Sequence, residues 1–202
     1  NSDDDTLEVA ERYAAMDNRI QVLHESQQGV VFAMNKGIMH SKGAFIMRMD
    51  ADDISYPDRI TNQVEAFDSD PSLQVISGLI TYEGSQENEG FRMYVEWLNS
   101  IKTDAEIKLN RFVEFPLANP SIMYKKEVFQ AYGRFEDGDF PEDYEYFLRL
   151  CSKNVVMGKV NRQVLKWHDS DQRLTRTDPR YSHDSFYKIK ARYLADWLAI
   201  SN

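Results

Sequence analysis

An α/β fold is the class that this sequence predicts, and three observations support it. Short apolar runs that suit buried strands alternate with longer stretches whose apolar residues recur at helical spacing. Three carboxylates, Asp50, Asp52 and Asp53, directly follow one of the apolar runs. The chain has 202 residues, 42% of them hydrophobic, enough for one domain with a sizeable core. We therefore expect an open, mostly parallel sheet flanked by helices, with its ligand outside the carboxyl ends of the strands.

The first part of the chain alternates between predicted helices and strands. In order, we expect a helix within 1–20, a short strand at 19–24, a helix between Gly29 and Gly43, a strand over 44–49, a helix after Pro57 with Ile60, Val64 and Phe67 on one face, and a buried strand over 73–82. The strand over 44–49 delivers the three carboxylates at its carboxyl end.

The second part of the chain changes its periodicity. In order, we expect one helix over 91–112, a short strand and a helix within 119–133, a helix opened by Pro141, two strands at 154–160 and 162–168, and a closing helix over 182–200. No internal repeat or low-complexity segment interrupts this pattern.

Charge and composition exclude several classes of partner. The net charge of −9 argues against a polyanion and suits a bound divalent cation better. The single cysteine, Cys151, cannot form an internal disulfide, so a cytoplasmic location is the default. No apolar run approaches the roughly 18 residues of a membrane span, and no signal peptide is recognisable.

Three carboxylates within four positions disfavour one another's ionisation unless a cation or hydrogen-bond donors compensate them. An EF-hand loop is excluded, because Ser55 and Thr61 stand where it needs glycine and glutamate. A phosphatase with an aspartyl nucleophile is disfavoured by Asp53 and Ile54, the two residues after the D-x-D, but stays open.

Two further interpretations of the acidic residues remain. Asp50 and Asp52 could hold Mg²⁺ or Mn²⁺ against a nucleotide diphosphate, while Asp53 stabilises the loop or the ligand. Alternatively, the acids form a solvated turn that caps the helix near Asp58. The local residues alone do not decide between these two.

The stretch over 28–67 closely resembles the family 2 glycosyltransferases of the GT-A fold. The matching elements are Gly29, the segment Ala33–Gly37, the segment Ser41–Gly43, the acids Asp50–Asp53, Pro57 and Gln63. Ser41 stands where alanine is usual. The resemblance implies that Gly29, Asn35 and all three acids bind a nucleotide-sugar donor, with Asp50 and Asp52 as ligands of Mn²⁺ or Mg²⁺.

The stretch over 119–150 resembles the acceptor half of the same family. By that resemblance, Asp143 is the general base that deprotonates the acceptor hydroxyl, and Glu142 is its neighbour in the catalytic pair. Pro141 places both acids at the positive end of a helix dipole, which is expected to stabilise their charged forms. The alternative is that the two acids only complement the dipole.

The tail over 164–182 resembles that of a subgroup of short bacterial family 2 enzymes. The resemblance implies that Arg173 and Arg176 could close over the diphosphate as it departs. His168 could be a third metal ligand. Surface arginines more often pair with nearby acids such as Asp171 and Asp178, and a lone histidine is seldom a ligand.

Relatives in this family begin with a strand, a helix and a second strand, and none of these is present before "NSDDDT". We therefore expect the sequence to be a crop of a longer chain. Its 202 residues are predicted to form a single GT-A domain. We divide it into a donor-binding part over 1–85, an acceptor part over 86–180 and a C-terminal helix over 181–202.

The function expected from the resemblance is metal-dependent transfer of a sugar, with inversion, from a nucleotide-diphosphate donor such as a UDP-sugar to a hydroxyl acceptor. The acceptor would be a glycan or a lipid-linked molecule, in cell-surface polysaccharide assembly. The alternative is a non-catalytic nucleotide-sugar or glycan-binding protein on the same fold. Peripheral contact with the inner membrane face, or a homodimer, stays open for the closing helix.

Overall fold

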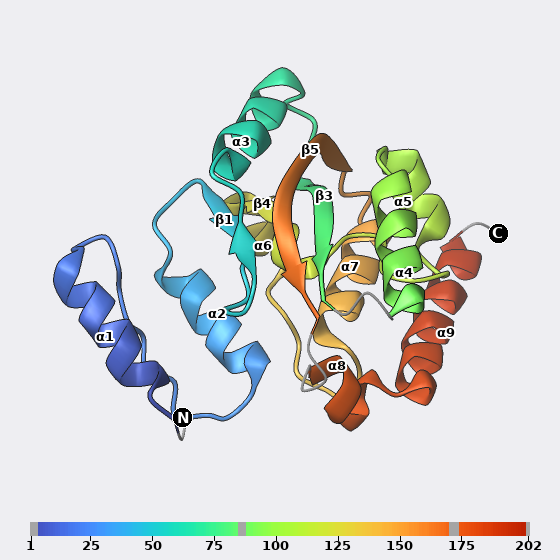
Figure 1. Ribbon diagram of the computed structural model, residues 1–202. Coiled ribbons are helices and arrows are strands. Elements are labelled where there is room, and N and C mark those ends of the chain that lie inside the picture. Colours follow the sequence, from blue (N-terminus) through green and yellow to red (C-terminus); the bar gives the residue numbers. More distant parts are fainter. Residues whose placement is uncertain (1–3, 85–87, 170–173, 201–202) are drawn as a thin grey trace. The chain divides into compact units, whose positions relative to one another are not determined.

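The computed structural model describes residues 4–84, 88–169 and 174–200. The chain forms two compact units, Asn1–Lys42 and Gly43–Asn202 (Figure 1). The second unit contains the sheet.

The first unit contains two helices, α1 (Thr6–Met16) and α2 (Val30–His40), and both were predicted. Gly29 precedes α2 with φ +136°, a conformation that side chains rarely adopt, and a Cβ there would lie 3.1 Å from the Phe32 ring. The strand predicted at 19–24 is wrong, because this segment has no regular structure. A strand needs a partner for its main-chain groups, and no strand lies beside it in the described part of this unit.

The second unit is built on a five-stranded sheet in the order β1-β4-β3-β5-β2 (Figure 1). The strands are, in chain order, β1 (Phe45–Met47), β2 (Ile54–Ser55), β3 (Val75–Glu83), β4 (Met123–Lys125) and β5 (Met157–His168). β3 pairs parallel with β5, whereas the β1–β4, β4–β3 and β5–β2 pairings are antiparallel. β1, β3 and β5 therefore point the same way, and β2 and β4 run against them. The prediction of a mostly parallel sheet needs correction, because three of these four pairings are antiparallel: β2 and β4 enter the sheet reversed.

β5 is one continuous strand where two were predicted. Its partner register jumps from Gly78↔Val160 to Leu79↔Gln163, so two extra residues bulge out of β5 and the ladder continues on both sides. Gly78 permits the close approach of β5 here, because a Cβ at this position would lie 2.4 Å from Val164 Cγ1. The polar break in the sequence is a bulge and not the end of a strand.

Helices pack against the sheet and against each other. They are α3 (Arg59–Ser69), α4 (Glu89–Ser100), α5 (Asp104–Asn110), α6 (Lys126–Tyr132), α7 (Glu142–Ser152), α8 (Leu174–Thr177) and α9 (His183–Ile200), with 3₁₀ turns η1 (Asn119–Ser121) and η2 (Pro179–Tyr181). α3 and α4 pack on β3, and α9 packs on α7. One core cluster joins α4 to the sheet through Ile80, Leu98 and Val164.

The single helix predicted over 91–112 is two helices, α4 and α5. Thr103 caps α5 by accepting a hydrogen bond from the Glu106 N–H at 3.3 Å, and the Glu106 side chain accepts one from the Thr103 N–H at 2.9 Å. This reciprocal capping box starts a new helix. Its T-x-x-E spacing is visible in the sequence, where helical periodicity concealed the break.

No helix among the described residues combines the length and the apolar character that crossing a membrane requires.

Candidate active site

The sheet brings the predicted acids to one edge. β1, β3 and β5 point the same way, so their carboxyl ends face the same side of the sheet; Met47 at the end of β1 pairs with Met123, and Glu83 pairs with His168 at the ends of β3 and β5. The acidic turn follows β1, and η1 leads into the reversed strand β4 at the same edge. This is where open α/β sheets bind their ligands.

Asp50, Asp52 and Asp53 form a compact carboxylate cluster. Each offers an oxygen within 4.8 Å of the others. Asp52 is exposed and Asp50 half-buried, whereas Asp53 is 7% exposed and its Oδ1 accepts a 2.9 Å hydrogen bond from the His168 N–H. Asp53 thus attaches the turn to the end of β5, while the other two carboxylates stay accessible to a ligand.

Two arginines compensate the repulsion among these acids. Arg48 pairs with Asp50 through contacts of 2.8 Å and 3.2 Å. Arg59, fully buried on α3, lies close enough to Asp53 for their charges to interact. Burial lowers the pKa of Arg59 to about 10, against the opposing effect of Asp53, so the guanidinium stays positive at neutral pH.

The donor chemistry of this cluster fits a hard divalent cation. Mg²⁺ and Mn²⁺ prefer carboxylate oxygens, and three such groups are gathered here. The His168 imidazole is outside the described group of gathered ligand atoms, and its side chain is exposed. Its backbone, rather than its ring, contributes to the turn.

Asp143 lies in the first turn of α7 and is held at both carboxylate oxygens. The Tyr144 N–H donates to Oδ1 at 2.7 Å, and the Asn119 side-chain amide donates to Oδ2 at 3.0 Å. The carboxylate keeps partial access to solvent. It is therefore oriented by the protein and still reachable by a substrate.

The expectation that the α7 dipole keeps Asp143 readily ionised needs correction. Burial, reinforced by the charge of Glu142, raises the pKa of Asp143 to about 7, although Arg48 and the two hydrogen bonds act in the opposite direction. Removing water from around a carboxylate outweighs the partial charge of a helix end. Asp143 thus titrates near neutrality.

Glu142, the neighbour of Asp143, is buried in the protein. It is 2% exposed, and its Oε2 accepts a 2.7 Å hydrogen bond from the Tyr181 hydroxyl on η2. Burial, together with Asp143 and Glu142, raises the pKa of Tyr181 well above its usual value, so the hydroxyl stays a donor. The contact attaches η2 to the start of α7.

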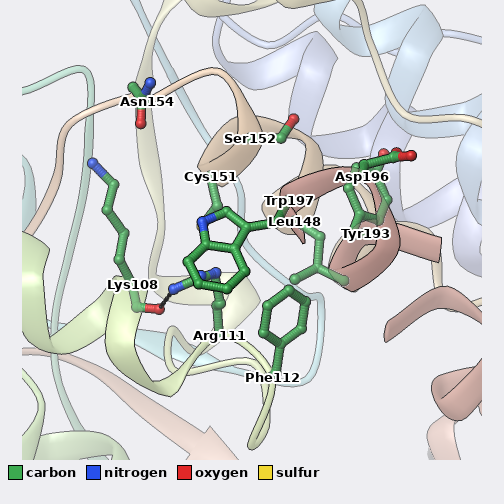
Figure 2. Close-up of a pocket in the computed structure, with 10 residues that line it drawn as sticks. All are labelled: Lys108, Arg111, Phe112, Leu148, Cys151, Ser152, Asn154, Tyr193, Asp196 and Trp197. Carbon is green, nitrogen blue, oxygen red and sulfur yellow. Dashed lines mark hydrogen bonds between the residues drawn. The ribbon is translucent and has the colours of Figure 1, made fainter. Parts of the chain in front are cut away.

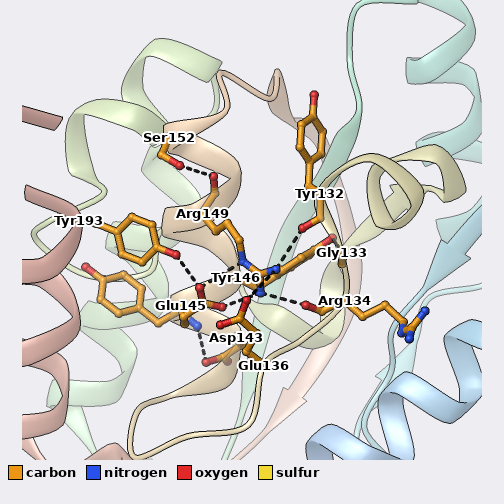
Figure 3. Close-up of polar contacts among 11 residues, drawn as sticks. Tyr132, Gly133, Arg134, Glu136, Asp143, Glu145, Tyr146, Arg149, Ser152 and Tyr193 are labelled. Carbon is orange, nitrogen blue, oxygen red and sulfur yellow. Dashed lines mark hydrogen bonds and ion pairs between the residues drawn. The ribbon is translucent and has the colours of Figure 1, made fainter. Parts of the chain in front are cut away.

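A buried network fixes α7 behind Asp143 (Figure 3). Glu145 is fully buried and accepts hydrogen bonds from Arg149 on its own helix and from the Tyr193 hydroxyl on α9 at 2.5 Å. Arg149 also donates to the carbonyl oxygens of Tyr132 at 3.0 Å and Arg134 at 2.9 Å. The helix that presents Asp143 is therefore secured on both sides.

Arg48 links the two groups of acids. Its guanidinium pairs with Asp50, and its charge acts on Asp143 as well, lowering the pKa of that carboxyl against burial. Arg48 thus interacts electrostatically with both Asp50 and Asp143, which are 93 positions apart in the chain. The charge of one arginine therefore acts on a metal-binding candidate and on the candidate base.

The remaining predicted site residues have other surroundings. Arg176 on α8 donates to Asp169 Oδ1 at 2.7 Å, which confirms the expectation of an acidic partner, although the partner is neither Asp171 nor Asp178. Arg173 lies outside the described residues. Gly29 and Asn35 belong to the first unit, as the residue before α2 and a residue within it.

Sequence reasoning missed the buried residues behind the site. The buried face of α3 is Arg59, Gln63 and Phe67, whereas Ile60, predicted to face the core, is 57% exposed. Gln63 was noted only as part of the family pattern, and Asn119 was not singled out. A signal existed for α3, because residues 59, 63 and 67 also follow helical spacing.

A separate cavity of about 230 Å³ lies among α5, α7 and α9 (Figure 2). None of the predicted site residues lines it. Arg111 lines it, with its guanidinium carbon 4.8 Å from the Phe112 ring centre and 5.2 Å from that of Trp197. Burial raises the pKa of the lining Cys151 to about 12, as expected of a structural thiol and not of a nucleophile.

Solved structures define the class of protein to which this fold belongs. Staphylococcus aureus TarS 1–349 in complex with UDP-GlcNAc matches 96% of this chain and 55% of its own, with TM-score 0.67 and 14% identity. The mannosyltransferase PcManGT from Pyrobaculum calidifontis, in complex with GDP-Man and Mn²⁺, matches 100% of this chain and 53% of its own, with TM-score 0.58 and 16% identity. The chain thus spans about half of these structures, and its fold is the GT-A fold of glycosyltransferases.

The sequence comparison identifies the family. The model of glycosyl transferase family 2 matches residues 1–133, and the chain belongs to that family. The Escherichia coli O-antigen biosynthesis glycosyltransferase WbnJ is 24% identical over 195 residues, which cover 92% of this chain and 72% of WbnJ. The α/β fold and the family expected from the sequence are both confirmed.

Proposed function

We propose that this protein transfers a sugar from a nucleotide-diphosphate donor to a hydroxyl acceptor with inversion, in the assembly of a polysaccharide or another surface glycan. The observation that supports the proposal most is that Arg48 pairs with Asp50 while its charge also acts on Asp143. A carboxylate cluster for the donor and a carboxylate for the acceptor are the two groups that such a transfer requires.

Asp143 acts as the general base. The acceptor hydroxyl loses its proton to Asp143 while its oxygen attacks the anomeric carbon, and the bond from that carbon to the diphosphate oxygen breaks. A single displacement of this kind inverts the anomeric centre, as in glycosidases whose base lies opposite the leaving group. A pKa of about 7 suits the base, because the carboxylate is then ionised yet basic enough to take a proton.

Asp50 and Asp52 hold the divalent cation, Mn²⁺ or Mg²⁺, and Asp53 fixes their turn to β5. When bound, the cation neutralises charge on the diphosphate leaving group. Mn²⁺ in the structure of PcManGT supports this assignment. Arg176 reaches the diphosphate only if it leaves Asp169, its partner in the structure.

The donor is proposed to be a UDP-sugar, and the UDP-GlcNAc bound to TarS supports that choice. A panel of UDP- and GDP-sugars, tested with Mn²⁺ for hydrolysis and for thermal stabilisation, measures the preference directly. Stabilisation by GDP-sugars alone would reject UDP as the donor nucleotide.

The decisive test compares the wild-type protein with Asp143→Asn. General-base catalysis contributes on the order of 10²–10⁴ in rate, so transfer should fall by about that factor while the Kd for UDP, measured calorimetrically with Mn²⁺, stays within about twofold. Normal turnover by the variant would remove Asp143 from the mechanism. Donor binding by a wild-type protein that turns over no acceptor would favour the non-catalytic alternative.

A further inference from the structure

A buried polar pair on α3 lies directly behind the carboxyl edge of the sheet. Arg59 and Gln63 are both 0% exposed and follow each other by one helical turn. Burying a charge and an amide costs several kcal/mol unless hydrogen bonds and nearby charge compensate it. Such a pair in the core therefore needs a physical reason.

The hydrogen bonds of the pair go to main-chain groups of the site segments. Gln63 Nε2 donates to the Ser121 carbonyl at 2.9 Å and to the Ile76 carbonyl at 3.3 Å. Arg59 Nη2 donates to the Arg48 carbonyl at 2.9 Å, with a longer contact of 3.5 Å to the Ile122 carbonyl. Gln63 Oε1 accepts from Arg59 Nε at 3.2 Å, so each side chain orients the other.

The carbonyls of Arg48 and Ser121, which accept these hydrogen bonds, are each close in sequence to a predicted site residue or its partner. Arg48 is two residues before Asp50, and Ser121 is two residues after Asn119, which holds Asp143. β1, which precedes the acidic turn, pairs with β4, which follows the Asn119 segment, and both strands are only three residues long. A ladder of three residue pairs is a weak restraint, so side-chain anchors contribute much of the local rigidity.

We infer that Arg59 and Gln63 are positioning residues that hold the acidic turn and the Asn119 segment in fixed register, so that the metal site and the base face the same sugar carbon. This inference rests on the proposed function. Neither side chain touches substrate, because both are fully buried. Their effect is transmitted through the Arg48 and Ser121 carbonyls, and a shift of about 1 Å at a reacting group can cost a factor of 10² in rate.

Gln63→Met removes both amide donors at similar volume, and Asn99→Leu is the matched control. Asn99 on α4 also bonds to main chain, accepting from the Ile80 N–H at 2.9 Å and donating to the Ile80 carbonyl at 2.8 Å, but it contacts neither site segment. Both variants lose an amide that secures a helix to β3. Only Gln63→Met releases Ser121.

Hydrogen exchange of the metal-free protein measures positioning without any activity. Gln63→Met should exchange faster than wild type in peptides covering 48–54 and 119–123, whereas Asn99→Leu should not. In the metal-loaded protein, we expect the Mn²⁺ affinity and kcat of Gln63→Met each to fall by about 10- to 100-fold, with less change in the KM for acceptor. Asn99→Leu should lower Tm and leave kcat within about twofold.

Arg59→Lys and Arg59→Met give a second, independent pair. Lysine keeps the charge near Asp53 and one donor, so Arg59→Lys should recover part of the Mn²⁺ affinity that Arg59→Met loses. If Gln63→Met does not fold, Arg59→Lys replaces it in every measurement. We then expect hydrogen exchange in peptides covering 48–54 to be faster in Arg59→Lys than in wild type.

The inference is overturned if the variants lower Tm as Asn99→Leu does but leave exchange over 48–54 and 119–123, Mn²⁺ affinity and kcat unchanged. A wild-type protein without turnover would instead contradict the proposed function. In that case, the exchange measurement still decides whether the pair positions the two segments.

Discussion

The acidic turn after β1 and the start of α7 use the same side chain in opposite surroundings. Asp52 in the turn is exposed and belongs to a cluster of three carboxylates compensated by arginines. Asp143 on α7 is half-buried and held by two hydrogen bonds, and its pKa is raised to about 7. Environments that differ this much suit identical groups to different chemistry, and in the proposed function one group is a metal ligand and the other a proton acceptor.

The largest effect is expected at the turn. Asp50→Asn with Asp52→Asn removes two anionic oxygen donors, so Mn²⁺ affinity should fall by at least about 100-fold and metal-dependent turnover by about 10³. Calorimetry and donor hydrolysis measure the two losses. Asp58→Asn, at the start of α3, is the matched control and should change neither. Full Mn²⁺ affinity in the double variant would contradict the proposal that the acidic turn binds the metal.

The next effect concerns the support of Asp143. Asn119→Ala removes a donor that lowers the pKa of Asp143, so that pKa rises and the base is ionised only at higher pH. The inflection of the kcat–pH profile should move up by about one pH unit, and kcat at pH 7 should fall. The variant leaves in place the other groups that act on Asp143. They are Glu142 and Tyr144 on α7, Arg48 after β1, Tyr124 on β4 and Tyr181 on η2. An unmoved inflection would show that Asn119 does not act on the base.

A smaller effect is expected on the pH dependence of the free energy of unfolding, through Asp143. The pKa of Asp143 is higher in the folded than in the unfolded protein, so ionisation destabilises the fold progressively as pH rises from about 4 to 7. Asp143→Asn should therefore raise the free energy of unfolding by about 1–3 kcal/mol at pH 8 and by little at pH 4. Urea denaturation at the two pH values measures this. A gain independent of pH would contradict the raised pKa.

The smallest effect tests Glu142 as an anchor. Tyr181→Phe removes the hydroxyl that donates to Glu142 and should cost about 1–2 kcal/mol of unfolding free energy in urea denaturation. Tyr187→Phe, on a side chain that is 68% exposed, is the control and should cost nothing measurable. Equal stability of the two variants would argue that the contact does not secure η2 to α7.

Much of this site could be predicted from neighbouring residues. The acids after β1, the acids that open α7 and the helices that carry them are local features, set by short spacings and helix-end chemistry. The two errors in element boundaries, the helix over 91–112 and the strands over 154–168, arose where a capping box and a bulge altered a pattern that otherwise continued.

By itself, the sequence determined the α/β class, the family and the two acidic segments, because order along the chain and periodicity are properties of neighbouring residues. Only the tertiary structure decided that Arg48 acts on both Asp50 and Asp143, that Asn119 holds the Asp143 carboxylate, and that Arg59 and Gln63 are buried. It also decided the raised pKa of Asp143, where the sequence suggested a stabilised charge. Desolvation and hydrogen bonding depend on residues far apart in the chain, and the sheet brings these residues together only when it forms.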